Sequence, residues 1–275
     1  MLALANKLSI LKYRFHHVVG GRSLASFQVA APNTAPKMAP TWQEEKKRYL
    51  QMSLHDKRKE YLCGDKFVIV DDLLPWDEYI LSKKHAPKKS PMPADFSINS
   101  AKNLKLCKKI SIFRGDITTL EVDAIVNAAN KSLLGGGGVD GAIHSAAGTM
   151  LVAENKTHGG CAIGEVKVSG GYQLPARVVI STVGPQGERP ELLRKCYKNS
   201  MDMLAKLNLK TIAFPSISTG IYGYPVKPAA HVSAQEVRKA LEQYDDKIDR
   251  VVFCLFSEVD EDTYSQVLPT YFPLQ

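Results

Sequence analysis

A glycine-rich run near the middle of the chain has the composition of an anion-binding loop. It consists of Gly135, Gly136, Gly137, Gly138, Val139, Asp140 and Gly141. Because glycine has no Cβ atom, the backbone N–H groups of this run can crowd around an anion. A helix is expected over residues 140–147, and the positive end of its dipole favours a phosphate at the same place. The run matches neither a Walker A loop nor the dinucleotide fingerprint, so it predicts a phosphate cradle of another kind.

The carboxylate of Asp140 is unexpected in a phosphate cradle, since like charges repel. It is explained if Asp140 orients a water molecule or holds a ribose hydroxyl. Asn130, just before the loop, can donate to and accept from the vicinal hydroxyls of a sugar. His144 lies one helical turn after Asp140, and it either orients that carboxylate or packs as an ordinary helix histidine. A flexible linker is the alternative, but a linker would not lie between a buried strand and a helix of small residues.

Two further loops with suitable chemistry follow predicted strands. In the first, residues 115–118, a glycine turns the chain and an aspartate can present its carboxylate to an amino group. Alone, this loop is more simply a turn with an aspartate cap. The second, residues 216–225, is rich in small residues and hydroxyls, and Tyr222 can lie flat against a sugar or base. No G-x-S-x-G elbow surrounds Ser216 or Ser218, so neither is a convincing nucleophile. Unless this loop is only a structural turn, two phosphate-binding loops predict a diphosphate held from both sides.

The elements that must position these loops are visible as apolar patterns. Strands are predicted over residues 110–113, 124–127, 165–169, 178–183, 211–215 and 251–256. Helices are predicted between them, over residues 140–147, 190–207, 228–243 and 260–268. Uninterrupted apolar runs indicate strands covered on both faces. The alternation predicts a three-layer α/β/α domain with a mostly parallel sheet, in which ligands bind beyond the carboxyl ends of the strands.

The chain before this domain divides into two predicted segments. Residues 1–40 are basic, contain no acidic residue and carry an apolar helical stripe. These features are typical of a mitochondrial transit peptide, with a disordered tail as the alternative. Residues 41–103 are predicted as a helical extension and linker, with a capping box at residues 41–44 and a second helix start near residue 53. The extension is either a partner-binding arm or a structure packed on the domain, which is expected over 104–275.

The composition and charge of the chain argue against several kinds of partner and site. The net charge of +8 suggests a nucleic-acid partner, but residues 1–43 hold five basic and no acidic side chains, so the rest of the chain is nearly neutral. We find no basic stripe with interleaved aromatic residues. The five cysteines form no CxxC pair, which argues against a disulfide framework and a zinc site. No apolar run approaches the roughly 20 residues of a membrane-spanning helix.

Four segments together resemble a macrodomain of the MacroD type. They are GDIT at residues 115–118, DAIVNAAN at 123–130, the glycine run at 135–141 and STGIYG at 218–223. The resemblance covers residues 105–273 and extends faintly into 42–62. It implies a six-stranded mixed, mostly parallel sheet in a three-layer macrodomain, preceded by the helical extension.

The resemblance also implies a site for ADP-ribose. Asp116 would bond the adenine amino group, Ile117 and Phe256 would line the adenosine end, and the two loops would hold the diphosphate and distal ribose. The implied binding residues are Gly115, Asp116, Ile117, Ala128, Ala129, Asn130, Gly135, Gly136, Gly137, Gly138, Val139, Asp140, Ile217, Ser218, Thr219, Gly220, Ile221, Tyr222, Gly223 and Phe256. The implied catalytic residues are Asn130, Asp140 and His144.

The activity implied by the resemblance is hydrolysis of ADP-ribose esters. Such enzymes remove ADP-ribose from mono-ADP-ribosylated Asp and Glu side chains and deacetylate O-acetyl-ADP-ribose. Water would attack with help from Asp140 and the substrate diphosphate, and no metal or cofactor is implied. Expected partners are ADP-ribose, O-acetyl-ADP-ribose and modified proteins, with nucleic acid only as an ADP-ribosylated substrate. We also expect a monomer without membrane contact. Its expected location is the mitochondrial matrix, with the nucleus or cytoplasm as the alternative. The resemblance further implies a role in the DNA damage response.

Alternatives remain within the same family resemblance. A binding-only reader of ADP-ribose marks is the main one, although readers often lack the pair formed by Asn130 and Asp140. A poly-ADP-ribose glycohydrolase would carry paired glutamates in this loop, where none is present. Two departures from the MacroD pattern, Ser145 in place of a basic residue and a short segment at 184–190, bear on substrate preference.

Overall fold

Six strands form the central sheet, as the sequence predicts. The structure is a computed structural model that describes residues 39–83, 90–94 and 96–274. The strands are β2 (Ile110–Arg114), β4 (Ala124–Ala129), β5 (Val166–Gly170), β6 (Val178–Val183), β7 (Thr211–Phe214) and β8 (Arg250–Leu255). Their order is β2-β8-β7-β4-β6-β5. Only the β5–β6 pair is antiparallel, so the predicted mixed, mostly parallel sheet is confirmed.

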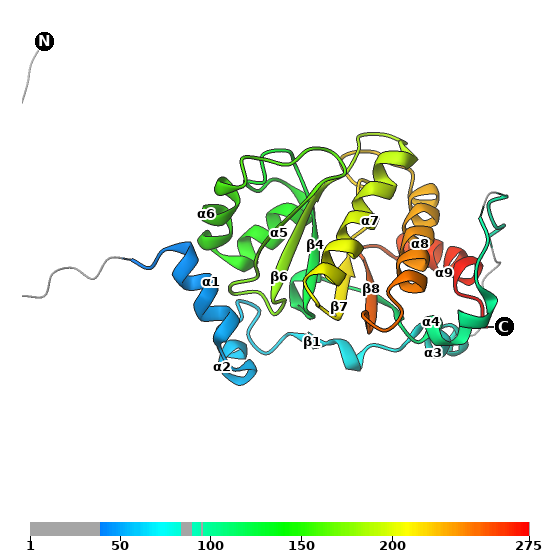
Figure 1. Cartoon of the computed structure of the whole chain (residues 1–275), viewed down its shortest axis with the longest axis horizontal. Helices are drawn as coiled ribbons and strands as arrows, with labels where there is room; N and C mark the ends of the chain where they lie inside the picture. Colours follow the sequence, from blue (N-terminus) through cyan, green and yellow to red (C-terminus); the bar gives the residue numbers. More distant parts are fainter. Residues whose placement is uncertain (1–38, 84–89, 95, 275) are drawn as a thin grey trace, which may run out of the picture. The chain divides into compact units, whose positions relative to one another are not determined.

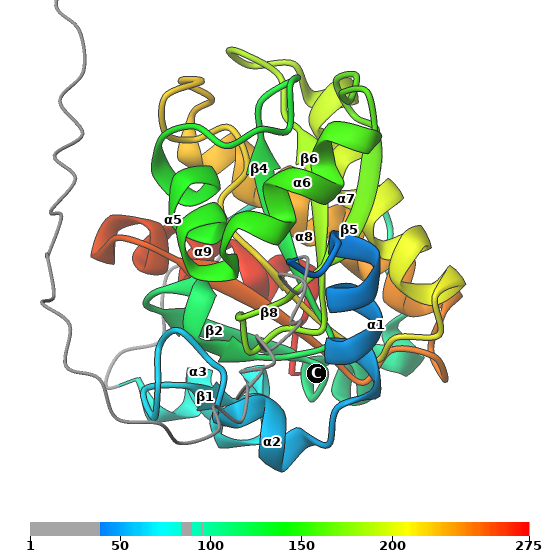
Figure 2. The ribbon, with the colours of Figure 1, turned by 90° about the vertical axis from the view of Figure 1, so that its left-hand side faces the viewer.

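Helices cover both faces of this sheet (Figures 1 and 2). One face packs against α7 (Pro190–Lys206), α8 (Val226–Gln243) and α9 (Glu258–Tyr271), and the other against α5 (Gly138–Ala147) and α6 (Thr149–Thr157). Consecutive strand residues therefore enter opposite cores: Val126 lies with α7 and α8, whereas Ile125 lies with α5 and α6. Because both faces are buried, all six positions of β6 are buried, which explains why polar and apolar residues do not alternate along it.

The extension before the sheet begins with two short helices. These are α1 (Trp42–Gln51), which has the predicted capping box at Thr41, and α2 (Leu54–Arg58), capped by Ser53. The predicted break falls at Met52. The second helix ends at Arg58, before Gly64, which lies in a following turn with φ of 57°.

Shorter elements connect the extension to the sheet. They are β1 (Val68–Ile69), which pairs with β3 (Leu120–Glu121), the 3-10 turns Val70–Asp72, Ser100–Lys102 and Ile117–Thr119, and the helices α3 (Trp76–Ser82) and α4 (Asn103–Cys107). Trp76 is fully buried in the core and donates from Nε1 to the Phe272 carbonyl oxygen. The sequence patterns did not predict the helices α3, α4 and α6 or the short strands β1 and β3.

Charged side chains of the extension are bonded to the sheet domain. Lys46 Nζ lies 2.5 Å from Glu154 Oε1, whose carboxylate is almost fully buried. Lys57 is buried and donates from Nζ to the carbonyl oxygens of Pro175 and Ala176 at 3.0 and 2.9 Å. Residues from Pro40 onward thus form one compact unit, in which the extension packs on the domain. The predicted transit peptide lies outside the described residues, apart from residues 39 and 40.

Lys57 should make stability depend on pH. Burial and the nearby Arg177 charge lower the pKa of Lys57 to about 8, whereas the unfolded side chain has a pKa of about 10.4. Between these values the unfolded chain binds more protons, so stability rises with pH. From pH 7.5 to 10, the free energy of unfolding should rise by about 2–3 kcal/mol more in the wild type than in Lys57→Met. Urea unfolding of both proteins measures this, and a pH-independent difference would contradict it.

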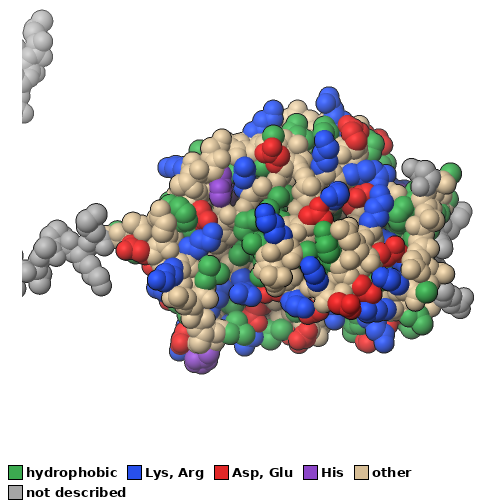
Figure 3. Space-filling model, viewed as in Figure 1, with side chains coloured by type: hydrophobic (Ala, Val, Ile, Leu, Met, Phe, Trp, Pro, Cys, Tyr) green, Lys and Arg blue, Asp and Glu red, His purple; other side chains and the backbone are tan. Residues whose placement is uncertain are grey.

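Charge on the surface is mixed. Figure 3 shows Lys and Arg side chains interspersed with Asp and Glu over the face viewed, in keeping with the nearly neutral sequence after residue 43. No helix among the described residues is long and apolar enough to cross a membrane. All five cysteines are free.

Candidate active site

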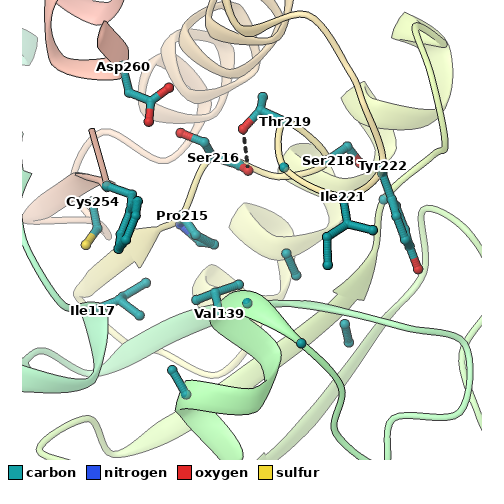
Figure 4. Close-up of a pocket in the computed structure, with 18 of the residues that line it drawn as sticks. Ile117, Val139, Pro215, Ser216, Ser218, Thr219, Ile221, Tyr222, Cys254 and Asp260 are labelled. Atoms are coloured by element: carbon teal, nitrogen blue, oxygen red, sulfur yellow. Dashed lines mark hydrogen bonds between the residues drawn. The ribbon is translucent and has the colours of Figure 1, made fainter. Parts of the chain in front are cut away.

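A cavity of about 860 Å³ opens where several strands end. Its walls come from residues that follow β2, β4, β6, β7 and β8, the carboxyl ends at which parallel sheets bind ligands. The lining residues are Gly115, Asp116, Ile117, Ala128, Ala129, Asn130, Gly137, Gly138, Val139, Ala142, Gly184, Pro215, Ser216, Ser218, Thr219, Gly220, Ile221, Tyr222, Cys254, Phe256, Ser257 and Asp260. In Figure 4, Ile117 and Val139 lie on one side of the cavity and the loop from Pro215 to Tyr222 lies on the other.

The glycine run forms the start of α5 on one wall. The helix begins at Gly138, two residues earlier than predicted, and no described side chain caps its first turn. The backbone N–H groups of that turn therefore remain available at the cavity, as an anion site requires. Gly135 and Gly138 have φ values of 90° and 61°, a region that side-chain-bearing residues rarely adopt. The run is thus shaped by its glycines to present N–H groups.

Asp140 lies behind this run rather than in the cavity lining, and it is 3% exposed. Its Oδ1 accepts a 2.8 Å hydrogen bond from Asn127 Nδ2 and lies 3.0 Å from His144 Nδ1. Its Oδ2 receives a long bond, 3.4 Å, from Asn130 Nδ2. Oδ1 is therefore held by two donors, whereas Oδ2 retains capacity to accept a hydrogen bond from a water or hydroxyl.

Gly136 packs directly over the pair formed by Asn130 and Asp140. A Cβ atom at position 136 would lie 3.1 Å from both Asn130 Nδ2 and Asp140 Oδ2. Asn130 also donates from Nδ2 to the Gly135 carbonyl oxygen at 2.8 Å. The loop, the amide and the carboxylate are therefore one connected unit, of which Asn130 and the loop residues 137–139 line the cavity and Asp140 does not.

His144 is buried against the same unit. Its Nδ1 lies 2.9 Å from the Asp140 backbone oxygen as well as near the carboxylate. Burial opposes a charged ring, but the hydrogen bonds and charge of Asp140 outweigh it and raise the pKa of His144. This histidine thus packs inside the helix layer and also contacts Asp140, and its role in orienting the carboxylate stays a prediction.

Asp116 both caps a turn and faces the cavity. Its Oδ1 accepts hydrogen bonds from the backbone N and the hydroxyl of Thr118, at 2.9 and 2.8 Å. The side chain is nevertheless exposed and lines the cavity beside Ile117. The two interpretations of this loop are therefore compatible.

The loop after β7 forms the opposite wall. Ser218 has a φ of 68° and is buried, and its Oγ has no hydrogen-bond partner among the described residues. Ile217 is fully buried in the core, so it can offer a ligand only backbone atoms. Ile221 and Phe256, by contrast, are 86% and 92% exposed at the cavity. Large apolar side chains this exposed are typical of binding sites.

The predicted and observed linings differ at several positions. Six predicted site residues lie outside the lining: Gly135, Gly136, Asp140, His144, Ile217 and Gly223. Seven lining residues were not predicted: Ala142, Gly184, Pro215, Ser216, Cys254, Ser257 and Asp260. Four of the latter, Gly184, Pro215, Ser216 and Ser257, lie within two residues after a strand end, a positional signal available from the sequence. Asn127, the donor to Asp140, was also missed, because it lies within a strand and not in a loop.

Comparison with known proteins identifies the family of the chain that forms this cavity. Residues 126–233 match the profile described as Macro domain. The chain is 44% identical over 242 residues to ADP-ribose glycohydrolase MACROD1 of Rattus norvegicus, covering 85% of this chain and 89% of that protein. The chain belongs to the macrodomain family. The macrodomain of Trypanosoma brucei, solved in complex with ADP-ribose, matches this macrodomain with a TM-score of 0.65 and 38% identity, covering 80% of this chain and 85% of that one.

The macrodomain also resembles longer relatives. It is 47% identical over 238 residues to ADP-ribose glycohydrolase MACROD2 of Xenopus laevis, covering 84% of this chain. That match covers 55% of the relative, so the chain spans about half the length of the MACROD2 proteins it matches.

The two departures from the MacroD pattern take different positions in this macrodomain. Ser145 is exposed on α5. The short segment after β6 is tied to the opposite wall, since Gly187 donates from its backbone N to the Tyr222 carbonyl oxygen at 2.7 Å. The second departure therefore contacts a residue that lines the cavity and, at Gly184, contributes one itself. Among the described residues, no three His, Cys, Asp or Glu side chains are grouped to hold a metal ion.

Proposed function

We propose that this macrodomain binds ADP-ribose in the cavity and hydrolyses the ester that joins ADP-ribose to Asp or Glu side chains. The same chemistry would deacetylate O-acetyl-ADP-ribose. The observation that carries the proposal is the unit of glycine loop, Asn130 and Asp140, which brings phosphate-binding N–H groups next to a buried carboxylate. The cavity volume of about 860 Å³ falls within the roughly 300–1,000 Å³ of small-molecule sites.

The proposed orientation of the ligand follows the chemistry of the walls. The adenine would lie between Ile117 and Phe256, with its amino group bonded to Asp116. The diphosphate would lie between the first turn of α5 and the loop from Ser218 to Tyr222. Such pre-formed N–H groups stabilise charge without rearranging during the reaction. The distal ribose would then lie against Asn130, beside Asp140.

In the proposed reaction, water attacks the ester without a covalent enzyme intermediate. Asp140 Oδ2, which receives only the long bond from Asn130 among the described residues, would orient this water or take its proton, with the substrate diphosphate as a second acceptor. Asn130, whose amide is held by Ser132, Gly135 and Asp140, would lie against the ribose and fix its position. The products are free ADP-ribose and the carboxylic acid of the modified side chain or of acetate.

A reader that only binds ADP-ribose is the second candidate, and the burial of Asp140 outside the lining favours it. A transferase that has modified its own Asp and Glu side chains with mono-ADP-ribose separates the two functions. We expect the macrodomain to release the labelled ADP-ribose, whereas a reader would leave the label in place. A substrate modified on arginine serves as the control, because its glycosidic nitrogen bond lacks the ester. Calorimetry with ADP-ribose measures binding directly, and absence of binding would contradict both candidates.

Location in the mitochondrial matrix stays a prediction from the basic, acid-free residues 1–40, and a role in the DNA damage response stays a prediction from the resemblance. A fusion of residues 1–40 to a fluorescent protein should enter mitochondria. A diffuse cytosolic signal would contradict the transit peptide.

A further inference from the structure

A buried amide on α6 lies on the side of His144 away from Asp140. Asn155 is 1% exposed. Its Nδ2 donates to the Leu133 carbonyl oxygen at 2.8 Å and lies 3.3 Å from His144 Nε2. Its Oδ1 accepts a 2.6 Å hydrogen bond from Ser169 Oγ. These contacts connect Asn155 to the ring that holds Asp140, although Asn155 is not part of the cavity lining.

The orientation of the Asn155 amide follows from its contact with Leu133, because a carbonyl oxygen can only accept and the atom 2.8 Å from it must therefore be Nδ2. Ser169 has one hydroxyl hydrogen, and the short bond gives it to Asn155 Oδ1. His158 Nε2, 3.0 Å from Ser169 Oγ, is then the donor in that contact. Because Oδ1 is held on the Ser169 side, the amide presents Nδ2, which can only donate, toward His144.

The two ring nitrogens of His144 have different surroundings. Nδ1 lies 2.9 Å from the Asp140 backbone oxygen and 3.0 Å from its Oδ1. A nitrogen facing two acceptors carries a proton. The negative charge of Asp140 favours a second proton, on Nε2, which would bond to the Leu133 oxygen at 3.2 Å. Asn155 Nδ2 opposes this second proton, because Nδ2 carries hydrogens of its own that point toward His144 Nε2.

Although burial opposes a charged ring, Asp140 raises the pKa of His144. We propose that Asn155 is a positioning residue that limits this effect of Asp140, so that His144 stays a neutral imidazole with its single proton on Nδ1. A doubly protonated ring would neutralise Asp140. A neutral ring orients the carboxylate through Nδ1–H and leaves its negative charge available at Oδ2. The inference rests on the proposed function, because it concerns the carboxylate assigned there to hydrolysis.

Asp140 is the titratable side chain within hydrogen-bond distance of His144 among the described residues. The loop before α5 contributes the neutral Leu133 carbonyl, and α6 contributes the neutral Asn155 amide. The neighbouring carboxylate on α6, Glu154, is bonded to partners on α1 and β5 and to a tyrosine after β5. The balance between Asp140 and Asn155 therefore decides the state of the ring.

The nitrogen resonances of His144 test this directly. They are recorded at pH 7 on protein with 15N-labelled histidine and assigned by their loss in His144→Gln. The wild type should show a protonated Nδ1 and an unprotonated Nε2. Asn155→Asp replaces the donor by an acceptor of similar shape, so Nε2 should become protonated. In the same variant, kcat should fall by roughly tenfold, while affinity for ADP-ribose stays within about twofold of the wild type.

Two further variants keep the inference testable if Asn155→Asp does not fold. Ser169→Ala frees Asn155 Oδ1 and should protonate Nε2 in part of the molecules. Asn199→Leu is the matched control, since it removes an asparagine bond to a backbone oxygen, 2.7 Å to Gly164, on the other face of the sheet. This control should leave the ring and kcat unchanged.

The outcomes are distinct. A wild-type ring protonated on both nitrogens at pH 7, or an unchanged ring in Asn155→Asp and Ser169→Ala, would overturn the role of Asn155. Failure of the wild type to hydrolyse ADP-ribose esters would instead overturn the proposed function, and the ring spectra would still test the inference.

Discussion

Asp140→Asn should bind ADP-ribose with nearly wild-type affinity and lose turnover by about 100–1,000-fold, the range expected for removal of a group that activates water. The buried Oδ1 accepts from Asn127 and lies beside His144 Nδ1, and an amide oxygen can keep both bonds. Only Oδ2 changes, from an acceptor to a donor. Calorimetry with ADP-ribose and single-turnover release of label separate binding from hydrolysis.

Asparagine is a sharper test at this position than alanine. Asp140→Ala would remove the carboxylate that accepts the 2.8 Å bond of the buried Asn127 amide and one of the two acceptors that face His144 Nδ1, at a cost of about 1–3 kcal/mol for a buried group that loses its bond. Alanine should also abolish turnover, but with a lower melting temperature that complicates the interpretation. The control is Asp116→Asn, at the adenine end, which should weaken binding and leave the rate of the bound complex near wild type. Hydrolysis at the wild-type rate by Asp140→Asn would refute the assignment of Asp140.

The sheet was predictable because a strand that is buried on both faces lacks the alternation of polar and apolar residues. A run such as 178–183 has no polar alternation, and its strand is buried at every position. The loops were predictable for a related reason, since parallel strands bring their carboxyl ends to one edge of the sheet. The residues of these loops therefore meet even though they are distant in sequence.

The degree to which each side chain is buried was not predictable in this way. The sequence places Asp140 beside a phosphate cradle, but only the packing shows that this carboxylate is buried and that Gly136 packs against it. Asn127 is one polar residue within an apolar strand, and the direction of its side chain depends on which face of β4 meets α5. The start of α5 was placed two residues late because glycine has a low helix propensity, which the contacts of the loop override.

Gly141→Ala is the second variant for which we expect a large effect. We expect it to destabilise the protein, whereas helix propensity alone predicts that it stabilises the helix. Gly141 lies inside α5, where alanine is favoured over glycine by about 1 kcal/mol. However, a Cβ atom at this position would lie 2.4 Å from the backbone oxygen of Gly136. No flexible side chain can relieve this contact, so the glycine run itself must move.

The displacement would reach both parts of the site. Gly136 packs over Asn130 and Asp140, and the residues after it supply the N–H groups at the cavity. We therefore expect Gly141→Ala to weaken ADP-ribose binding by at least about tenfold, since each 1.4 kcal/mol of lost contact is a factor of ten in affinity. The melting temperature should fall despite the favourable propensity. Calorimetry and thermal unfolding measure the two effects.

Ser145→Ala is the matched control, because Ser145 lies one turn later on the same helix and is exposed. It gains helix propensity without a new contact, so its binding should be unchanged and its melting temperature equal or slightly raised. If Gly141→Ala behaves like this control, the glycine run is not held against α5 and its N–H groups are not pre-formed. If the two variants diverge, the close approach of Gly136 and Gly141 is what lets one loop serve both the phosphate and the carboxylate.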